Sequence, residues 1–424
     1  MNRFIATIIF SFLLISCASA KEKRSLGEYE DLWPDFKGNV LPIELESIEL
    51  KSTIKVTGEY IESMEFVSPT ELIGITSEGV VFLIDVKTEG YRIVRELGKI
   101  GAWYLKIHNS DEFMAFGYTI EHSANEYRQQ EYYEIECFRK NGDSIWSKRH
   151  FELPSGTYTQ ILFDGKNYFL IDQGLNGIVD IYELSNEGDL ILYQEDIGDV
   201  TSYYFKFTIG RDLYFMTSRI GPYFCKGEDN GFPKLELWNE NWDSGLTRPF
   251  IDSKNGLLGF RVSPVNIGDL DEKYELIILP SRSERPLILD FIDELGLDYF
   301  DFREEWGANN LICSDGDFTA LGYTHHLLKY VDGRVSIWQQ NLDKYMNKSN
   351  DVFYMNSLNV DKFYGNFIVS TSSGLIYGNE EFHSVDGTMN GIGKLHFATD
   401  YKFAAAAGGD GEVAIFEIHH KNEI

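Results

Sequence analysis

Cysteine is scarce in this chain and is not arranged in any recognised pattern. Only four cysteines occur in 424 residues, and none belongs to the C-x-x-C pattern of zinc knuckles and thiol redox motifs. The three that follow Cys17 lie beside aromatic or aliphatic residues, so we expect buried free thiols. For a chain in an oxidising compartment, the alternative is one disulfide between two of Cys137, Cys225 and Cys313. The fold must therefore be stable without a disulfide framework.

Basic residues are also few. The chain has 38 lysine and arginine residues against 67 aspartate and glutamate residues, which gives a net charge of −29. Nucleic acid is not an expected partner, because contacts to phosphates require clustered basic side chains. Dense negative charge keeps an exported protein soluble, and we expect a monomeric fold.

Motifs for catalysis and metal binding are missing. The sequence contains no H-E-x-x-H, no G-x-S-x-G and no phosphate loop. His325 and His326 are adjacent on a predicted strand, so their rings point to opposite faces and cannot bind one ion together. The acidic runs 266–275 and 313–322 lack the residue order of a calcium loop and are interpreted as solvated loops. We therefore expect no catalytic residue, cofactor or metal, and the sequence leans against an enzyme.

The apolar run near the N-terminus, residues 4–15, is too short to span a bilayer and fits an export signal. Two processing patterns compete. Residues 18–20 (ASA) match the A-x-A site of ordinary signal peptidase. Residues 14–17 (LISC) resemble the bacterial lipobox, in which Cys17 is lipidated and begins the mature chain. Either pattern predicts a location outside the cytoplasm of a bacterium, as a periplasmic protein or outer-membrane lipoprotein, or alternatively as a secreted protein.

A hairpin pattern recurs along the rest of the chain. An alternating apolar strand runs into a polar turn with glycine, and a second alternating strand follows. The turn glycines are Gly90, Gly142, Gly188, Gly245, Gly296, Gly333 and Gly378. The steps between them are 52, 46, 57, 51, 37 and 45 residues, a spacing that favours a propeller or another repeat architecture.

Two more strand-like segments precede several of these hairpins. Before Gly90 they are residues 64–69 (MEFVSP) and 71–77 (ELIGITS). Four strands in each repeat are the composition of a propeller blade. We found no long segment with helical apolar periodicity, so the sequence predicts an all-β fold.

The last repeat is incomplete. It has three predicted strands, at residues 394–400, 402–410 and 411–418. Small residues fill the second, as expected where sheets crowd together near the axis of a propeller. Residues 48–56 (IELKSTIKV) alternate in the same way and can supply the fourth strand, which would close the ring. We predict a propeller of eight four-stranded blades, with seven as the alternative because residues 254–321 are irregular.

Two stretches carry a resemblance to known families. The run FATDYKFAAAAGGDGEVAIF from Phe397 resembles the last repeat of a WD40-type propeller, although it lacks the Gly-His and Trp-Asp dipeptides. The hairpins IDVKTEGYRIV and FRKNGDSIWS resemble repeats of quinoprotein-like propellers. With its lipobox, the chain also resembles the propeller lipoprotein of the outer-membrane β-barrel assembly machinery. That resemblance implies a scaffold role by analogy of fold.

These observations divide the chain into a signal peptide (1–20), a leash (21–47), a single propeller (48–418) and a tail (419–424). The hypothesis for function is a non-enzymatic exported propeller that binds a protein or peptide and is tethered to the membrane by a lipid. The alternative is an enzyme or glycan-binding protein with its site at one mouth of the propeller channel.

One pair of aromatic residues is a candidate for binding. Most aromatic clusters on the predicted strands are expected to pack between sheets. Trp238 and Trp242 instead flank the polar turn NEN, and they are the candidates for a partner-binding rim.

Overall fold

The computed structural model describes most of the chain beyond residue 39. The described residues are 40–56, 60–98, 102–107, 111–122, 129–150, 156–163, 168–174, 179–194, 208–209, 212–217, 221–228, 231–237, 247–252, 256–264, 272–279, 285–290, 295–296, 311–314, 317–323, 326–339, 342, 355–363, 365–371, 374–379, 382–386, 393, 395–408 and 411–421. None of the helices within these ranges is long and apolar enough to cross a membrane.

The described strands form eight sheets, numbered here in chain order. Sheet 1 contains β3 (Ile61–Phe66), β4 (Glu71–Thr76), β5 (Val80–Asp85) and β6 (Gly90–Glu96). Sheet 2 contains β7 (Ala102–Ile107), β8 (Glu112–His122), β9 (Gln129–Arg139) and β10 (Ser144–His150). Sheet 3 contains β11 (Gly156–Phe163), β12 (Tyr168–Gly174), β13 (Val179–Leu184) and β14 (Leu190–Gln194). Sheet 4 contains β15 (Thr208–Ile209), β16 (Asp212–Thr217), β17 (Gly221–Glu228) and β18 (Gly231–Leu237).

The other four sheets follow the same plan. Sheet 5 contains β19 (Thr247–Asp252), β20 (Gly256–Pro264), β21 (Glu272–Leu279) and β22 (Leu287–Asp290). Sheet 6 contains β23 (Leu311–Ser314), β24 (Thr319–Tyr323), β25 (His326–Val331) and β26 (Arg334–Gln339). Sheet 7 contains β27 (Met355–Asp361), β28 (Phe367–Thr371), β29 (Gly374–Gly378) and β30 (Phe382–Asp386), together with β1 (Val40–Leu41). Sheet 8 contains β31 (His396–Phe397), β32 (Phe403–Ala407), β33 (Glu412–His420) and β2 (Leu45–Lys55).

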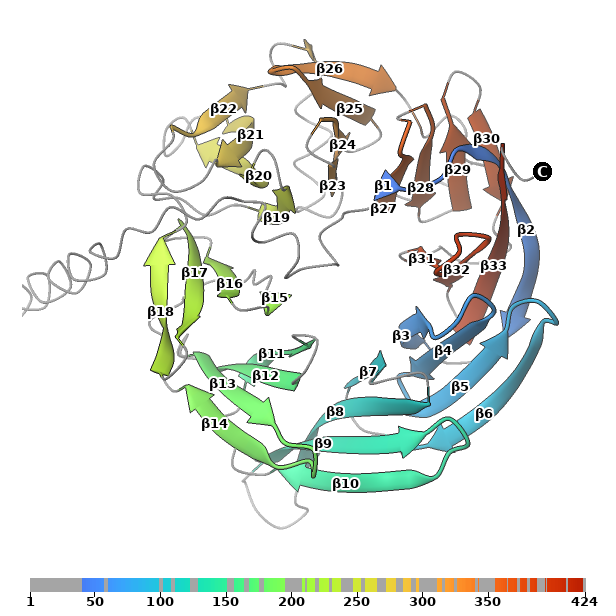
Figure 1. Ribbon diagram of the computed structural model, residues 1–424, viewed down its shortest axis with the longest axis vertical. Helices are drawn as coiled ribbons and strands as arrows, with labels where there is room; N and C mark the ends of the chain where they lie inside the picture. The colour runs from blue at the N-terminus through green and yellow to red at the C-terminus, as the bar shows by residue number, and fades with distance from the viewer. Residues whose placement is uncertain are drawn as a thin grey trace, which may run out of the picture.

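The sheets stand around a common centre, as Figure 1 shows. In sheets 1 to 6 the four strands pair in chain order as an antiparallel meander, with the first strand nearest the centre and the fourth on the outside (Figure 1). The predicted hairpins at Gly90, Gly142, Gly188, Gly333 and Gly378 are confirmed by the strand pairing. At Gly333 the turn has two residues with positive φ, Asp332 at 49° and Gly333 at 80°, which suits the twist of a tight hairpin.

One other predicted hairpin is wrong. The strands on either side of Gly245, β18 and β19, belong to sheets 4 and 5 and do not pair with each other. The apolar segment before Gly245 is therefore the last strand of sheet 4. The hairpin predicted at Gly296 stays a prediction, because the segment that would form its second strand lies outside the described residues; β22, upstream of it, is the fourth strand of sheet 5 and pairs with β21. Period-2 alternation identifies a strand but does not distinguish a third strand that enters a hairpin from a fourth strand that ends a sheet.

Sheet 8 joins the two ends of the described chain. Strand β2 pairs antiparallel with β33, and Ile48 lies opposite Ile418 while Ile54 lies opposite Val413. Strand β1 pairs in parallel with β27 of sheet 7. Strand β1 and the beginning of β2 thus lie inside the predicted leash, residues 21–47. Leu41, Ile43 and Leu45 of this segment are buried between sheets 7 and 8. At the other end β33 continues to His420, inside the predicted tail.

The core lies between neighbouring sheets. Ala404 and Ala406 of β32 face sheet 7 and pack with Ile368 and Leu375. Ala405, between them, faces sheet 1 in the cluster that contains Phe82. Both faces of β32 are therefore covered, and short side chains let the two flanking sheets approach it closely. The run of alanines lies on the second strand from the centre of this sheet.

Gly74 illustrates how tightly this core is packed. It lies on β4, directly opposite Phe82 on β5. A Cβ atom at residue 74 would lie 2.3 Å from Cζ of Phe82, whose side chain is completely buried. The phenyl ring occupies the space above the glycine, so residue 74 has no room for a side chain.

We expect Gly74→Ala to lower the free energy of unfolding by about 1–3 kcal/mol, because Phe82 must leave its place in a close-packed core. Gly365→Ala is the matched control, since no heavy atom lies within 4 Å of a Cβ at that residue. The control should be neutral or slightly stabilising. Urea titration followed by tryptophan fluorescence measures both. Equal midpoints for the two variants would contradict this account of the packing.

Candidate functional site

The site residues predicted from the sequence lie outside the described part of the chain. This holds for Cys17, the predicted lipid attachment residue, and for Trp238 and Trp242, the predicted partner-binding rim. These three predictions therefore stay predictions.

The buried-thiol prediction is confirmed for two cysteines. Cys137 and Cys313 are free of disulfides and buried in sheets 2 and 6. Burial, together with the negative charges of Glu112 and Glu136, raises the pKa of Cys137 to about 11. The thiol therefore stays protonated near neutral pH and is a poor nucleophile. The side chain of Cys225, on β17, lies outside the described part of the structure.

One of the aromatic clusters is part of the packing. Tyr132 and Tyr133 on β9 are both buried, and the guanidinium of Arg149 lies 5.2 Å from the ring centre of Tyr132. Within the described residues, no three histidine, cysteine or acidic side chains gather closely enough to hold a metal ion.

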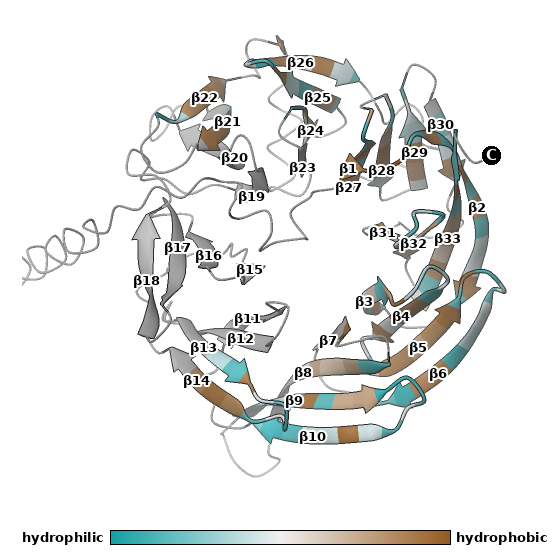
Figure 2. Cartoon of the chain, in the orientation of Figure 1, coloured by the Kyte–Doolittle hydropathy of each residue, from teal (hydrophilic) through white to brown (hydrophobic). Residues whose placement is uncertain are grey.

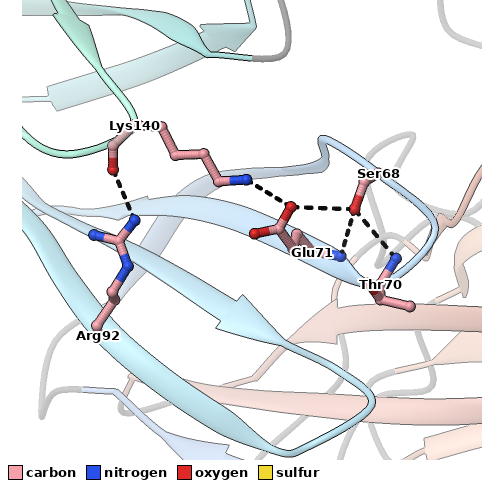
Figure 3. A network of polar contacts seen from close by, with 5 residues as sticks. All are labelled: Ser68, Thr70, Glu71, Arg92 and Lys140. Carbon is pink, nitrogen blue, oxygen red and sulfur yellow. Dashed lines mark hydrogen bonds and ion pairs between the residues drawn. The ribbon is translucent and has the colours of Figure 1, made fainter.

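Polar side chains fasten the tip of the β9–β10 hairpin to sheet 1 (Figure 3). Lys140 at this tip forms an ion pair with Glu71 at the start of β4, with 2.6 Å between Nζ and Oε2. Arg92 of β6 donates a hydrogen bond of 2.7 Å to the carbonyl oxygen of Lys140. Ser68 donates to Glu71 at 3.4 Å and accepts from the backbone N–H groups of Thr70 and Glu71 (Figure 3). The carboxylate of Glu71 is therefore held in place from both sides.

A second ion pair lies deeper in the same junction. Arg95 of β6 pairs with Glu136 of β9, which is only 6% exposed, and donates a 2.8 Å hydrogen bond to the carbonyl of Gly142. Ser144 donates to the same carboxylate at 2.9 Å. Gly142 has a φ of +93°, and a Cβ atom there would lie 2.3 Å from the carbonyl oxygen of Val94. The turn residue must therefore be glycine both for its conformation and for this close contact.

The next junction repeats this arrangement with other residues. Lys148 of β10 pairs with Asp189 at 2.8 Å, and a ring nitrogen of His150 lies 3.0 Å from the carbonyl oxygen of Gly188. A Cβ atom at Gly188 would lie 2.5 Å from the ring of Trp146. We call this arrangement the hairpin clasp: the tip of the last hairpin of one sheet bonds to the outer strand of the preceding sheet. The glycine spacing predicted these turns, but their contacts depend on a neighbouring sheet that no local pattern reveals.

Apolar side chains are exposed on several outer strands. Figure 2 shows hydrophobic segments on β6, β10, β14 and β22 along the outside of the ring. We call these residues the outer-strand surface. Its members, with their exposed fractions, are Tyr91 (47%), Ile93 (49%), Ile145 (38%), Ile191 (55%), Leu192 (47%), Leu287 (39%) and Ile288 (44%). Sequence reasoning missed this surface because alternation marks a residue as apolar without showing that no neighbour covers it.

The comparisons with known proteins identify the fold. No family model and no curated protein matches the chain. Among solved structures, the Dos1 propeller is similar over 87% of this chain and 95% of its own, with a TM-score of 0.54 and 8% identity. The computationally designed protein Ika8 is similar over 90% of this chain and 100% of its own, with a TM-score of 0.53 and 10% identity. The predicted all-β propeller fold is thus confirmed.

The Arg95–Glu136 pair gives a test of the hairpin clasp. We expect Arg95→Ala to lower the free energy of unfolding by about 3 kcal/mol, because the carboxylate of Glu136 is left in the junction without its cation. Lys148→Ala removes a more exposed pair and should cost less than about 1 kcal/mol. Urea titration of the two variants in parallel checks the difference. Similar losses in both would show that Glu136 is not effectively buried.

Proposed function

We propose that this chain is a non-enzymatic, exported propeller that binds a protein or peptide and is held at a bacterial membrane by a lipid on Cys17. The outer-strand surface is the observation that carries the binding function. Exposed apolar clusters on an otherwise polar surface are typical of protein contact sites. Tyr91 and Ile93 lie on the same face of β6, and each exposes almost half of its side chain.

In this proposal the eight sheets are the blades of a closed ring. The pairing of β2 with β33 supports the closure, because it ties the beginning of the described chain to its end. The core on each side of sheet 8 adds support, since one cluster joins it to sheet 7 and another joins it to sheet 1.

Buried polar groups support a scaffold because they are engaged in holding the fold. Glu136 is bound by Arg95 and Ser144 in the junction of sheets 1 and 2. Asp361, which is 1% exposed, accepts hydrogen bonds from the backbone N–H groups of residues 363 and 365 and from the side chain of Asn366. These carboxylates organise loops and sheet junctions, whereas a catalytic carboxylate would have to reach a substrate.

The lipobox supports the tether. Residues 14–17 place a cysteine where a lipid would be attached, and a lipid anchor at this end would leave the propeller outside the cytoplasm. The location proposed is the periplasmic face of a bacterial membrane, and cleavage after residue 20 would instead release the protein.

Recovery of a partner tests the binding function. The tagged protein, used as bait in envelope extracts in mild detergents, should recover a discrete protein identified by mass spectrometry. A variant with Ile93→Thr, Ile191→Thr and Leu192→Thr should recover at least about tenfold less, because the apolar contacts are lost while threonine keeps the strand propensity.

The control for this experiment is Phe363→Thr, which removes a residue that is 54% exposed on a turn of sheet 7. It should recover as much partner as the unchanged protein. Recovery at background level by the unchanged protein, across several detergents, would contradict the proposal.

Labelling with palmitate tests the tether. The unchanged protein should incorporate labelled palmitate in a bacterial host and sediment with membranes, whereas Cys17→Ala should lose the label and become soluble after processing. Absence of label from the unchanged protein, with the same membrane retention in both, would exclude a lipid on Cys17.

A further inference from the structure

Among the described residues, the outer strand of each of the eight sheets pairs with a neighbour on one side alone, and an unpaired edge binds other strands unless it is protected. Charged residues and proline are the usual protection, because they oppose pairing with another chain. Among the described outer strands, seven carry at least one charged residue or proline: β2, β6, β10, β18, β22, β26 and β30. Strand β14, with the sequence LILYQ, carries none.

Strand β14 is also open on both of its faces. Successive residues of a strand point to opposite faces of the sheet. Ile191 is 55% exposed and Leu192 is 47% exposed, so neither face of the strand is covered there. On its inner side β14 pairs with β13, where Ile191 lies opposite Glu183 and Leu192 lies opposite Tyr182. The outer edge therefore offers main-chain groups between two exposed apolar side chains.

The fold already contains strands that were added to sheet edges. Strand β2 reaches sheet 8 from the other end of the chain and pairs with β33 along most of its length. Strand β1 adds in parallel to the inner edge of sheet 7. Sheets of this protein thus accept strands that are distant in the sequence, in either direction.

The charge of the chain and of the turn before β14 indicates which kind of strand can pair with β14. A second copy of the chain is disfavoured, since each copy carries a net charge of −29. The turn that leads into β14 contains Glu187 and Asp189, both exposed. Asp189 pairs with Lys148, whereas the carboxylate of exposed Glu187 has no ion pair among the described residues and its backbone N–H donates to Ser185. The local charge therefore favours a segment with lysine or arginine.

We infer that β14 accepts an extended segment of a partner protein as a fifth strand of sheet 3. The segment has apolar side chains that cover Ile191 and Leu192, and a basic residue near Glu187. Main-chain hydrogen bonds to the edge supply affinity and the flanking side chains supply selectivity. This inference rests on the proposed function and narrows its outer-strand surface to one strand.

Designed peptides test the pairing directly. The probe is a fluorescein-labelled octapeptide of alternating lysine and valine, and its binding to the full protein is followed by fluorescence anisotropy at 0.15 M salt. A second peptide has the same sequence with its four central amides methylated, which removes the donors needed for strand pairing and keeps the charge. We expect methylation to weaken binding at least tenfold, and an alternating glutamate–valine peptide to bind still more weakly.

Protein variants assign the binding to β14. Ile191→Thr/Leu192→Thr should weaken binding of the lysine–valine peptide at least tenfold, whereas Phe363→Thr should leave it unchanged. Hydrogen exchange of residues 190–194 should slow when the peptide is bound. Equal binding of the methylated peptide would show attraction by charge alone and would overturn the inference. So would a dimer in sedimentation that disappears in the Ile191→Thr/Leu192→Thr variant, because the occupant would then be a second copy.

The same variant separates this inference from the proposed function. If Ile191→Thr/Leu192→Thr recovers the envelope partner as well as the unchanged protein does, the β14 site is wrong and the scaffold function stands. If no partner is recovered by any form while the lysine–valine peptide pairs with β14, the edge binds strands but the proposed envelope partner is wrong.

Discussion

The pairing of β2 with β33 is the interaction on which the rest of the structure depends. Sheet 8 lies between sheets 7 and 1, and it contains residues from both ends of the described chain. Without β2, strand β33 would become an exposed edge, and apolar residues such as Ile48 and Ile54 would lose their buried surroundings. In the closed ring that we propose, stability is distributed over all the junctions between sheets, so one open junction would expose the apolar faces of two neighbouring sheets at once.

Small residues and the hairpin clasps stabilise different parts of the junctions between sheets. Near the centre, alanine lets adjacent sheets approach closely, as at Ala405, and Gly74 leaves room for the ring of Phe82 within its own sheet. Farther out the sheets diverge, and ion pairs and hydrogen bonds such as Arg95 with Glu136 connect hairpin tips to the preceding outer strand. Neither the small residues nor the hairpin clasps bury the apolar side chains that the outermost strands expose. These exposed apolar side chains therefore take little part in the contacts between sheets.

The sequence predicted the repeating parts of this fold because they depend on local chemistry. Alternation and turn glycines identified the hairpins at Gly142, Gly188 and Gly333, and the same alternation matched residues 48–56 to the incomplete last repeat. The hairpin predicted at Gly245 was wrong because a strand that ends a sheet has the same pattern as one that enters a turn. Strand β1 went unpredicted because two residues carry no periodic signal.

The candidate site was less accessible from the sequence. Exposure of Ile191 and Leu192 is a property of the assembled ring, since the same letters in a second or third strand would be buried. The motif-based candidates, Cys17, Trp238 and Trp242, stay predictions because they lie outside the described residues.

Hydrogen exchange of the native protein, resolved to residues 45–55 and 412–420, is the most direct test of the closure of the ring. We predict that the backbone amides of β2 that donate to β33 exchange as slowly as the amides of β33, because both open only when sheet 8 opens, whereas the alternate amides of β2 face outward. Fast exchange of the inward-facing amides of β2 beside slow exchange in residues 412–420 would contradict this closure, since β2 would then not be a stable strand of sheet 8.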